Sequence, residues 1–348
     1  MKKALLFSLI LLLSVFLIAC NSDSSSSDGG NEGNDDNGGS EETGNTGDSG
    51  DSGESSSSYP EKPIQVVVPA GAGGDTDRNS RITAKYLSEE LGEDVVVSNV
   101  SGAGGTVGAK QVLDAEADGY TVLAFHNSMI INGILELADF DYQDYELAGV
   151  AVSDLGNAFI VNAESEFTDL QSLIDAAKER PGEITIATET GAFTHLQLLA
   201  FQEETGTEFN IVDIGSASEK VTALLGGQID IVPTQLGLVM EYIESGDFRS
   251  IGIMAEERLP GAPDVPTFKE QGVEVVFDKF YFWAFPKGTP QDVVDTFSKA
   301  LENVTNNPDF QAEMEPHLVE LGYIGPDDLA NHFAERTEQY TQLNESAQ

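Results

Sequence analysis

Two glycine-rich loops, each between an apolar strand and a helix, constrain the fold of this 348-residue chain more than any other feature. The first, PAGAGGDTD, runs from Pro69 to Asp77 and follows the strand pattern PIQVVVP. The second, SGAGGTVGA, runs from Ser101 to Ala109 and follows the strand pattern DVVVSNV. A third apolar run at 120–127 completes a β-α-β-α-β order. This order favours a parallel sheet with helices on its faces.

The two loops predict an anion-binding crevice. The first N–H groups of a helix lack partners and carry partial positive charge, and glycine lets an anion approach the backbone closely. Neither loop contains a lysine or arginine, so backbone amides would bind the anion. Thr76 or Asp77 is expected to cap the first helix, which favours capping over acid–base chemistry for Asp75 and Asp77. The alternative is that both loops are only tight turns.

Several common kinds of site have no support in the sequence. The first loop lacks the Gly-Lys-Ser/Thr ending of a P-loop, and no Gly-x-Ser-x-Gly motif indicates a hydrolase. The four histidines and the single cysteine share no metal-ligand spacing, so no catalytic residue, metal or cofactor is predicted. With 17 basic and 60 acidic residues and a net charge of −43, the chain is not expected to bind nucleic acid.

The N-terminal residues are predicted to lie outside the fold. Residues 1–19 have two lysines followed by an apolar stretch, which is typical of a signal peptide. Cys20 follows Leu-Ile-Ala, as in a bacterial lipobox, and is the expected lipidation site; the alternative is an ordinary secretory peptide with an incidental cysteine. Residues 20–58 are rich in serine, glycine and acidic side chains and are predicted to form a disordered tether.

Five motifs then follow one another along the chain. They are PAGAGGDTD, SGAGGTVGA, ADGYTVL, LLGGQIDIVP and PDVPTFKEQG. Together they resemble the substrate-binding proteins of tripartite tricarboxylate transporters, also called Bug proteins, over about Lys62 to Gly325. The resemblance implies an α/β, two-lobed clamshell like the type II periplasmic binding proteins, with a mainly parallel sheet in each lobe. It places residues 60–161 and 281–348 in lobe 1 and residues 162–280 in lobe 2.

The resemblance also implies where a ligand carboxylate would bind. The first lobe would supply the two glycine loops, and the second lobe would supply the loop TETGAFTH and the segment that ends at Gln235. His126 ends a strand at the expected crevice, so it and its neighbour Asn127 are further candidates. The residues predicted to contact the ligand are Ala72, Gly73, Gly74, Asp75, Thr76, Asp77, Ala103, Gly104, Gly105, His126, Asn127, Thr190, Gly191, Ala192 and Gln235.

The chain departs from the family pattern in ways that bear on the ligand. It has Asp213-Ile214-Gly215 where a Tyr-Lys-Gly-like turn is usual, and its second-lobe loop contains Glu189 and Phe193. The missing basic contact and the acidic wall disfavour a citrate-like trianion. An acidic wall would suit a monocarboxylate, an amino acid or a ligand with its own positive or neutral end. The expected ligand is a small organic anion, drawn from the mono-, di- and tricarboxylates and the amino acids.

These features predict an extracytoplasmic, lipid-anchored solute-binding protein and not an enzyme. It would capture a small carboxylate-bearing metabolite between its lobes and deliver it to integral membrane permease subunits. The expected location is the extracytoplasmic face of the cell membrane. Two alternatives stay open: a component that presents its ligand to a membrane signalling kinase, and a secreted enzyme acting on a small carboxylate.

Overall fold

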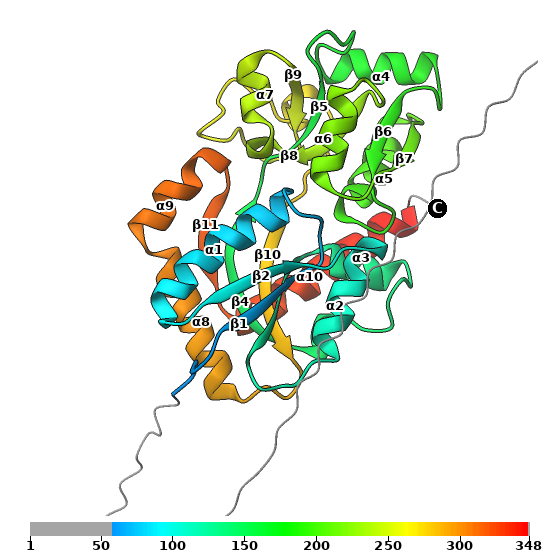
Figure 1. Ribbon diagram of the computed structural model, residues 1–348. Helices are drawn as coiled ribbons and strands as arrows, with labels where there is room; N and C mark the ends of the chain where they lie inside the picture. Colours follow the sequence, from blue (N-terminus) through cyan, green and yellow to red (C-terminus); the bar gives the residue numbers. More distant parts are fainter. Residues whose placement is uncertain (1–57, 347–348) are drawn as a thin grey trace, which may run out of the picture. The chain divides into compact units, whose positions relative to one another are not determined.

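The computed structural model describes residues 58–346, whose strands form two sheets (Figure 1). The first sheet has the order β11-β4-β10-β3-β1-β2 and the second has the order β7-β6-β8-β5-β9. The strands of the first sheet are β1 (Ile64–Val68), β2 (Val95–Asn99), β3 (Thr121–His126), β4 (Tyr145–Asp154), β10 (Lys279–Pro286) and β11 (Glu320–Ile324). Those of the second are β5 (Asn157–Asn162), β6 (Thr185–Thr188), β7 (Asn210–Asp213), β8 (Ile231–Gln235) and β9 (Phe248–Ile253).

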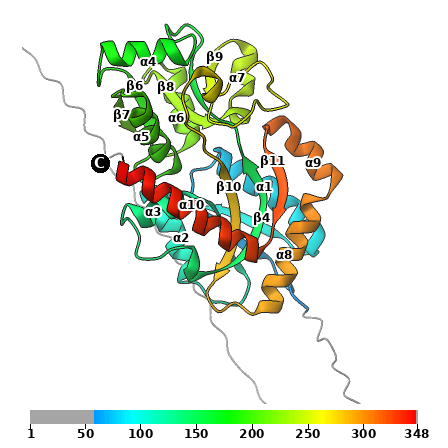
Figure 2. The same cartoon turned by 180° about the vertical axis from the view of Figure 1, so that it is seen from behind.

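Helices flank both sheets, as the two opposite views in Figures 1 and 2 show. The helices are α1 (Asp75–Leu91), α2 (Thr106–Leu113), α3 (Ser128–Ile134), α4 (Leu170–Glu179), α5 (Phe193–Thr205), α6 (Ala217–Leu225), α7 (Met240–Ser245), α8 (Gln291–Thr305), α9 (Pro308–Met314) and α10 (Pro326–Ser346). The predicted signal peptide, Cys20 and most of the predicted tether lie outside the described residues. Among the residues that are described, no helix combines the length and apolar character needed to cross a membrane.

Strand β10 shows how the sequence builds the first sheet. All its residues are buried, and their side chains alternate between the two faces. Phe280 and Phe282 pack against Phe333 of α10 on one face. Trp283 packs against Phe297 of α8 on the other face. Because both faces are covered by helices, the strand reads as a continuous apolar run and lies inside the sheet, between β4 and β3.

The two-sheet α/β architecture was predicted, but the sheets are mixed rather than mainly parallel. Strand β1 pairs in parallel with β2 and β3, as the β-α-β-α-β order predicts. Strand β10, however, is antiparallel to β3 and β4, and β5 is antiparallel to β8 and β9. A strand buried on both faces has the same apolar pattern in either direction, so the sequence pattern did not reveal these orientations.

The chain passes from the first sheet to the second between Asp154, which ends β4, and Asn157, which begins β5. It returns between Ile253 of β9 and Lys279 of β10. The family resemblance implied a first boundary after residue 161, which would assign most of β5 to the first lobe. Since β5 pairs with β8 and β9, we propose that the second lobe begins with β5.

Gly105 gives a stability test of the second glycine loop. Its φ is +96°, and a Cβ at this position would lie 2.2 Å from Cζ of Phe125. We expect Gly105→Ala to lower the free energy of unfolding by roughly 2–4 kcal/mol, because backbone strain and the clash add together. The matched control is Gly92, whose φ is +76° but whose Cβ would meet no atom within 4 Å.

Gly92→Ala is expected to cost only about 1 kcal/mol, the price of the left-handed backbone alone. Urea unfolding of the two variants measures the difference. Equal losses would show that the Phe125 ring does not constrain the loop.

Candidate functional site

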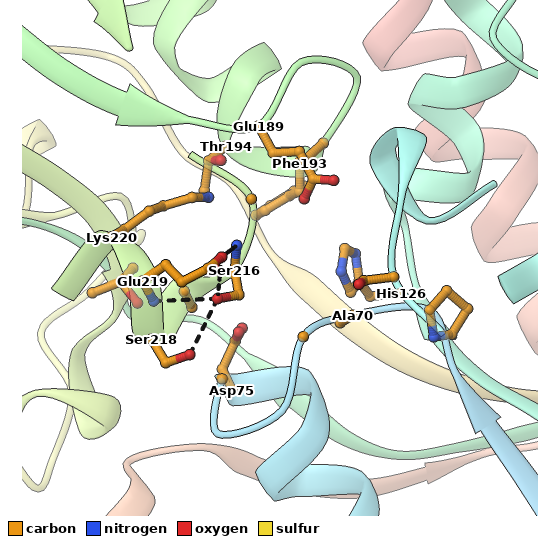
Figure 3. Close-up of a pocket in the computed structure, with 18 of the residues that line it drawn as sticks. Ala70, Asp75, His126, Glu189, Phe193, Thr194, Ser216, Ser218, Glu219 and Lys220 are labelled. Carbon is orange, nitrogen blue, oxygen red and sulfur yellow. Dashed lines mark hydrogen bonds between the residues drawn. The ribbon is translucent and has the colours of Figure 1, made fainter. Parts of the chain in front are cut away.

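A cavity of about 390 Å³ lies among loops of the two sheets, a size suited to a small molecule (Figure 3). From the first sheet, the lining includes the β1–α1 loop, Ser101 and Gly102 of the second glycine loop, and His126. From the second sheet, it includes Glu189, the start of α5 and residues 215–220 at the start of α6. Lys279, at the start of β10, also lines the cavity.

The β1–α1 loop presents backbone amides, although the helix begins earlier than predicted. The cap is Gly74, in an extended conformation, and the expected cap at Thr76 or Asp77 is wrong. Asp77 instead lies in the first turn, where its Oδ2 accepts a hydrogen bond from the N–H of Gly73 at 2.8 Å. The N–H groups of Ala72 and Gly74 have no hydrogen-bond partner within residues 58–346. These two amides are available to an anion.

The second glycine loop has a different role in the structure. The N–H of Gly104 donates to Oε1 of Glu189 at 3.2 Å, and the N–H of Gly105 donates to the carbonyl of Gly102 at 3.0 Å. The carbonyl of Gly104 accepts from Nδ2 of Asn132 at 3.1 Å. The loop therefore joins the two lobes through Glu189, and its amides at Gly104 and Gly105 are already used.

Further hydrogen bonds connect the lobes around the cavity. The Ser218 hydroxyl donates to the carbonyl of Ala72 at 3.0 Å. Arg78 donates to the carbonyl of Gly237 at 3.1 Å and also to the side chain of Gln235. With the contact between Gly104 and Glu189, these bonds hold the walls of the cavity together.

An ion pair lies in the wall of the cavity. Nζ of Lys279 is 2.5 Å from Oδ2 of Asp75, and the Tyr281 hydroxyl donates to the same oxygen at 2.8 Å. Burial alone would raise the pKa of Asp75, but the Lys279 ammonium and the hydrogen bonds from Lys279 and Tyr281 more than reverse this and hold it well below 3.8. Asp75 is therefore an ionised carboxylate whose charge is already neutralised.

His126 is buried and lines the same cavity. Burial lowers its pKa well below 6.5, and the nearby Lys279 ammonium lowers it further against the opposing effect of Asp75. Its Nδ1 accepts a hydrogen bond from the N–H of Ser128 at 3.2 Å, which assigns the proton of the neutral ring to Nε2. His126 can therefore donate one hydrogen bond without bringing charge.

Lys220 is a pocket residue that sequence reasoning missed. Figure 3 shows its side chain reaching into the pocket from α6. The residue is 5% exposed, and its ammonium has neither a hydrogen bond nor an ion pair with any residue that the structure describes. A signal was present, because Lys220 lies four positions before the buried Leu224 and so occupies the buried face of α6.

The residues that the sequence analysis predicted to contact the ligand divide into two groups. Those that line the cavity are Ala72, Gly74, Asp75, His126 and Ala192. Those outside its lining are Gly73, Thr76, Asp77, Ala103, Gly104, Gly105, Asn127, Thr190, Gly191 and Gln235. Several of the second group have other partners: Asn127 donates to the carbonyl of Asp278 and to Tyr340, and Thr190 donates to Asp213. Within residues 58–346, no group of three or more His, Cys, Asp or Glu is placed to hold a metal ion.

Comparison with known proteins gives consistent results. Residues 80–347 match the model of the TctC family, described as the tripartite tricarboxylate transporter family receptor. Protein BugT of Bordetella pertussis is 34% identical over 242 residues, which cover 68% of this chain and 74% of BugT. The structure of the periplasmic binding protein BugD is 29% identical with a TM-score of 0.79, and covers 83% of this chain and 98% of BugD. MatC of Rhodopseudomonas palustris, solved with bound malate, is 22% identical with a TM-score of 0.77, and covers 82% of this chain and 99% of MatC.

Proposed function

We propose a function for this chain from its family: it belongs to the TctC family of tripartite tricarboxylate transporter receptors. The protein would bind a small carboxylate between its two lobes and deliver it to the membrane permease of such a transporter. The protein would bind its ligand without chemical change. The apolar stretch that ends at Cys20 supports an extracytoplasmic location and a lipid anchor at that cysteine. The malate bound to MatC supports a carboxylate as the cargo.

The observation that carries this proposal is the cavity lining. The amides of Ala72 and Gly74, which have no hydrogen-bond partner in residues 58–346, lie just before or at the N-terminus of α1 and line the cavity. The Lys220 side chain reaches into the same cavity from α6 (Figure 3). Amides at a helix start bind carboxylates well because their N–H groups and the helix dipole both favour negative charge. Asp75 does not repel such a ligand strongly, since Lys279 neutralises it.

Gly74 offers a direct test of the loop. A Cβ at Gly74 would lie 3.3 Å from the Cβ of Ala217 in α6, so a larger side chain would enter the space between the lobes. The extended backbone at Gly74 tolerates a β-branched residue. We therefore expect Gly74→Val to fold normally and to lose carboxylate binding.

The measurement is a thermal-shift screen of mono-, di- and tricarboxylates and amino acids. A ligand at 100 times its Kd should stabilise the unmodified protein by about 2.7 kcal/mol, and Gly74→Val should abolish that shift. The matched control is Gly322→Val in β11, where a Cβ would meet no atom within 4 Å. An unchanged shift in Gly74→Val would remove the loop from the site, and the absence of any carboxylate shift in the unmodified protein would overturn the proposed function.

A further inference from the structure

The Lys220 ammonium is a buried positive charge without a partner within residues 58–346. The residue is 5% exposed and lies one turn into α6. A buried charge that has neither a counter-charge nor hydrogen bonds is unfavourable, so it marks a place where a ligand can supply the missing partner. Since the unmatched charge is positive, that partner should be an anionic group.

Two neutral side chains that line the cavity also have polar atoms without a hydrogen-bond partner in residues 58–346. Asn157 of β5 and Thr234 of β8 are buried, on adjacent antiparallel strands, and both line the cavity. The Asn157 Oδ1 and the Thr234 Oγ1 have no hydrogen-bond partner in the described part of the chain. A hydroxyl can donate, and the orientation of an asparagine amide follows its hydrogen bonds, so both side chains can donate to an anion.

The acidic side chains near Lys220 do not form an ion pair with it. Burial lowers the pKa of Lys220 to about 8; Glu189 opposes this shift, Lys279 adds to it, and Asp75 and Asp213 oppose it. The lysine therefore remains mainly charged at neutral pH. Glu189 already accepts the N–H of Gly104, and Asp75 already pairs with Lys279, so neither carboxylate forms an ion pair with Lys220.

We propose that Lys220, with Asn157 and Thr234, forms a second anion-binding subsite, so that the cargo is a dicarboxylate with one group at the β1–α1 loop and the other at Lys220. This inference rests on the proposed function and deepens it by naming the charge of the ligand's far end. A monocarboxylate would leave the ammonium unpaired. An amino acid with an uncharged side chain would place its single carboxylate at one subsite and leave the other empty.

The test compares acids of equal chain length that differ by one carboxylate. Succinate with butyrate, and adipate with hexanoate, are titrated into the full chain at pH 7 by calorimetry, with alanine as an amino-acid probe. We expect a dicarboxylate to bind about ten to a hundred times more tightly than its monocarboxylate partner, the effect of one charged hydrogen-bonding contact. Lys220→Met should remove that preference by weakening dicarboxylate binding more than monocarboxylate binding, and Lys220→Arg should retain part of it.

Lys178→Met, at an exposed position of α4, is the matched control and should preserve the preference. Thermal unfolding without ligand shows whether each variant is folded. Equal loss of mono- and dicarboxylate binding in Lys220→Met would indicate a structural lysine and overturn the inference. So would equal binding of the two acids, or tighter binding of alanine, in the unmodified protein. If no carboxylate binds the unmodified protein, the proposed function fails and this inference falls with it.

Discussion

Replacing Lys279 by methionine is expected to lower the free energy of unfolding by about 3–5 kcal/mol, because it leaves the buried Asp75 carboxylate without its counter-charge. The pair has excellent geometry, with 2.5 Å between Nζ and Oδ2, and both side chains are almost fully buried. Of its partners within residues 58–346, only the Tyr281 hydroxyl would remain hydrogen-bonded to the carboxylate. Urea unfolding at pH 7 measures the loss.

The double variant Asp75→Asn/Lys279→Met separates charge from packing. It removes both charges and keeps a polar group for Tyr281, so it should recover most of the lost stability. Glu166→Gln is the control, because the ion pair of Glu166 with Arg180 is largely exposed, at 65% and 41%, and should contribute less than about 1 kcal/mol. If the double variant is as unstable as Lys279→Met alone, the unpaired charge is not the cause.

The same pair predicts a dependence on acid pH. The pKa of Asp75 is lower in the folded protein than its ordinary value of 3.8, so the folded state binds fewer protons than the unfolded state just below that pH. The contribution of the ionised Asp75 to the free energy of unfolding is therefore complete above about pH 4, and it is lost as the pH falls further. The stability difference between Lys279→Met and the unmodified protein should shrink below pH 4, and a constant difference would contradict this assignment.

The local order of elements was predictable because it depends on neighbouring residues. Strand, glycine loop and helix alternate within short stretches, and β1, β2 and β3 pair in parallel as expected. The crevice at the ends of these strands follows from the same order, and the first loop, with Ala72 and Gly74, lines the cavity. Local pattern therefore predicted the parallel part of the first sheet, β1 to β3, and one wall of the cavity.

The charges of the site were not predictable in the same way. Sequence reasoning assigned anion binding to the backbone alone, because neither glycine loop contains a cation. Lys220 and Lys279 reach the cavity from α6 and β10, which are far from the loops in the sequence and come close only when the sheets assemble. Glu189 was predicted to form part of an acidic wall. Its hydrogen bond from the N–H of Gly104 joins positions 85 residues apart and depends on how the lobes pack together.

Asp154→Asn is the second substitution expected to have a large effect on stability. It should raise the free energy of unfolding, whereas Lys279→Met should lower it. Asp154 ends β4 and is 0% exposed, and its side chain accepts a hydrogen bond from the N–H of Gly156 at 2.8 Å. Its Oδ2 is buried and has no partner in residues 58–346. Burial raises its pKa to about 7, and this outweighs the hydrogen bond from Gly156 and the attraction of Lys279 and Arg78.

A raised carboxyl pKa lowers stability as the pH rises. Between the ordinary value of 3.8 and about 7, the folded state of Asp154 binds more protons than the unfolded state, so the free energy of unfolding falls with increasing pH. The loss is complete above pH 7 and amounts to about 4 kcal/mol, at 1.36 kcal/mol for each unit. Asp154→Asn cannot ionise, and its Oδ1 can keep the bond to Gly156.

We therefore expect Asp154→Asn to be more stable than the unmodified protein at pH 8, by up to about 4 kcal/mol, and nearly equal to it at pH 4. Urea unfolding at pH 4, 6 and 8 measures the difference. Asp264→Asn, at an exposed position, is the control and should change stability by less than about 0.5 kcal/mol at each pH. Parallel curves for Asp154→Asn and the unmodified protein would show that Asp154 ionises as readily when folded as when unfolded. If the stability difference between Asp154→Asn and the unmodified protein increases with pH, Asp154 is protonated below neutral pH in the folded state. This acid lies directly beside the passage from β4 to β5, where the chain crosses between the two sheets.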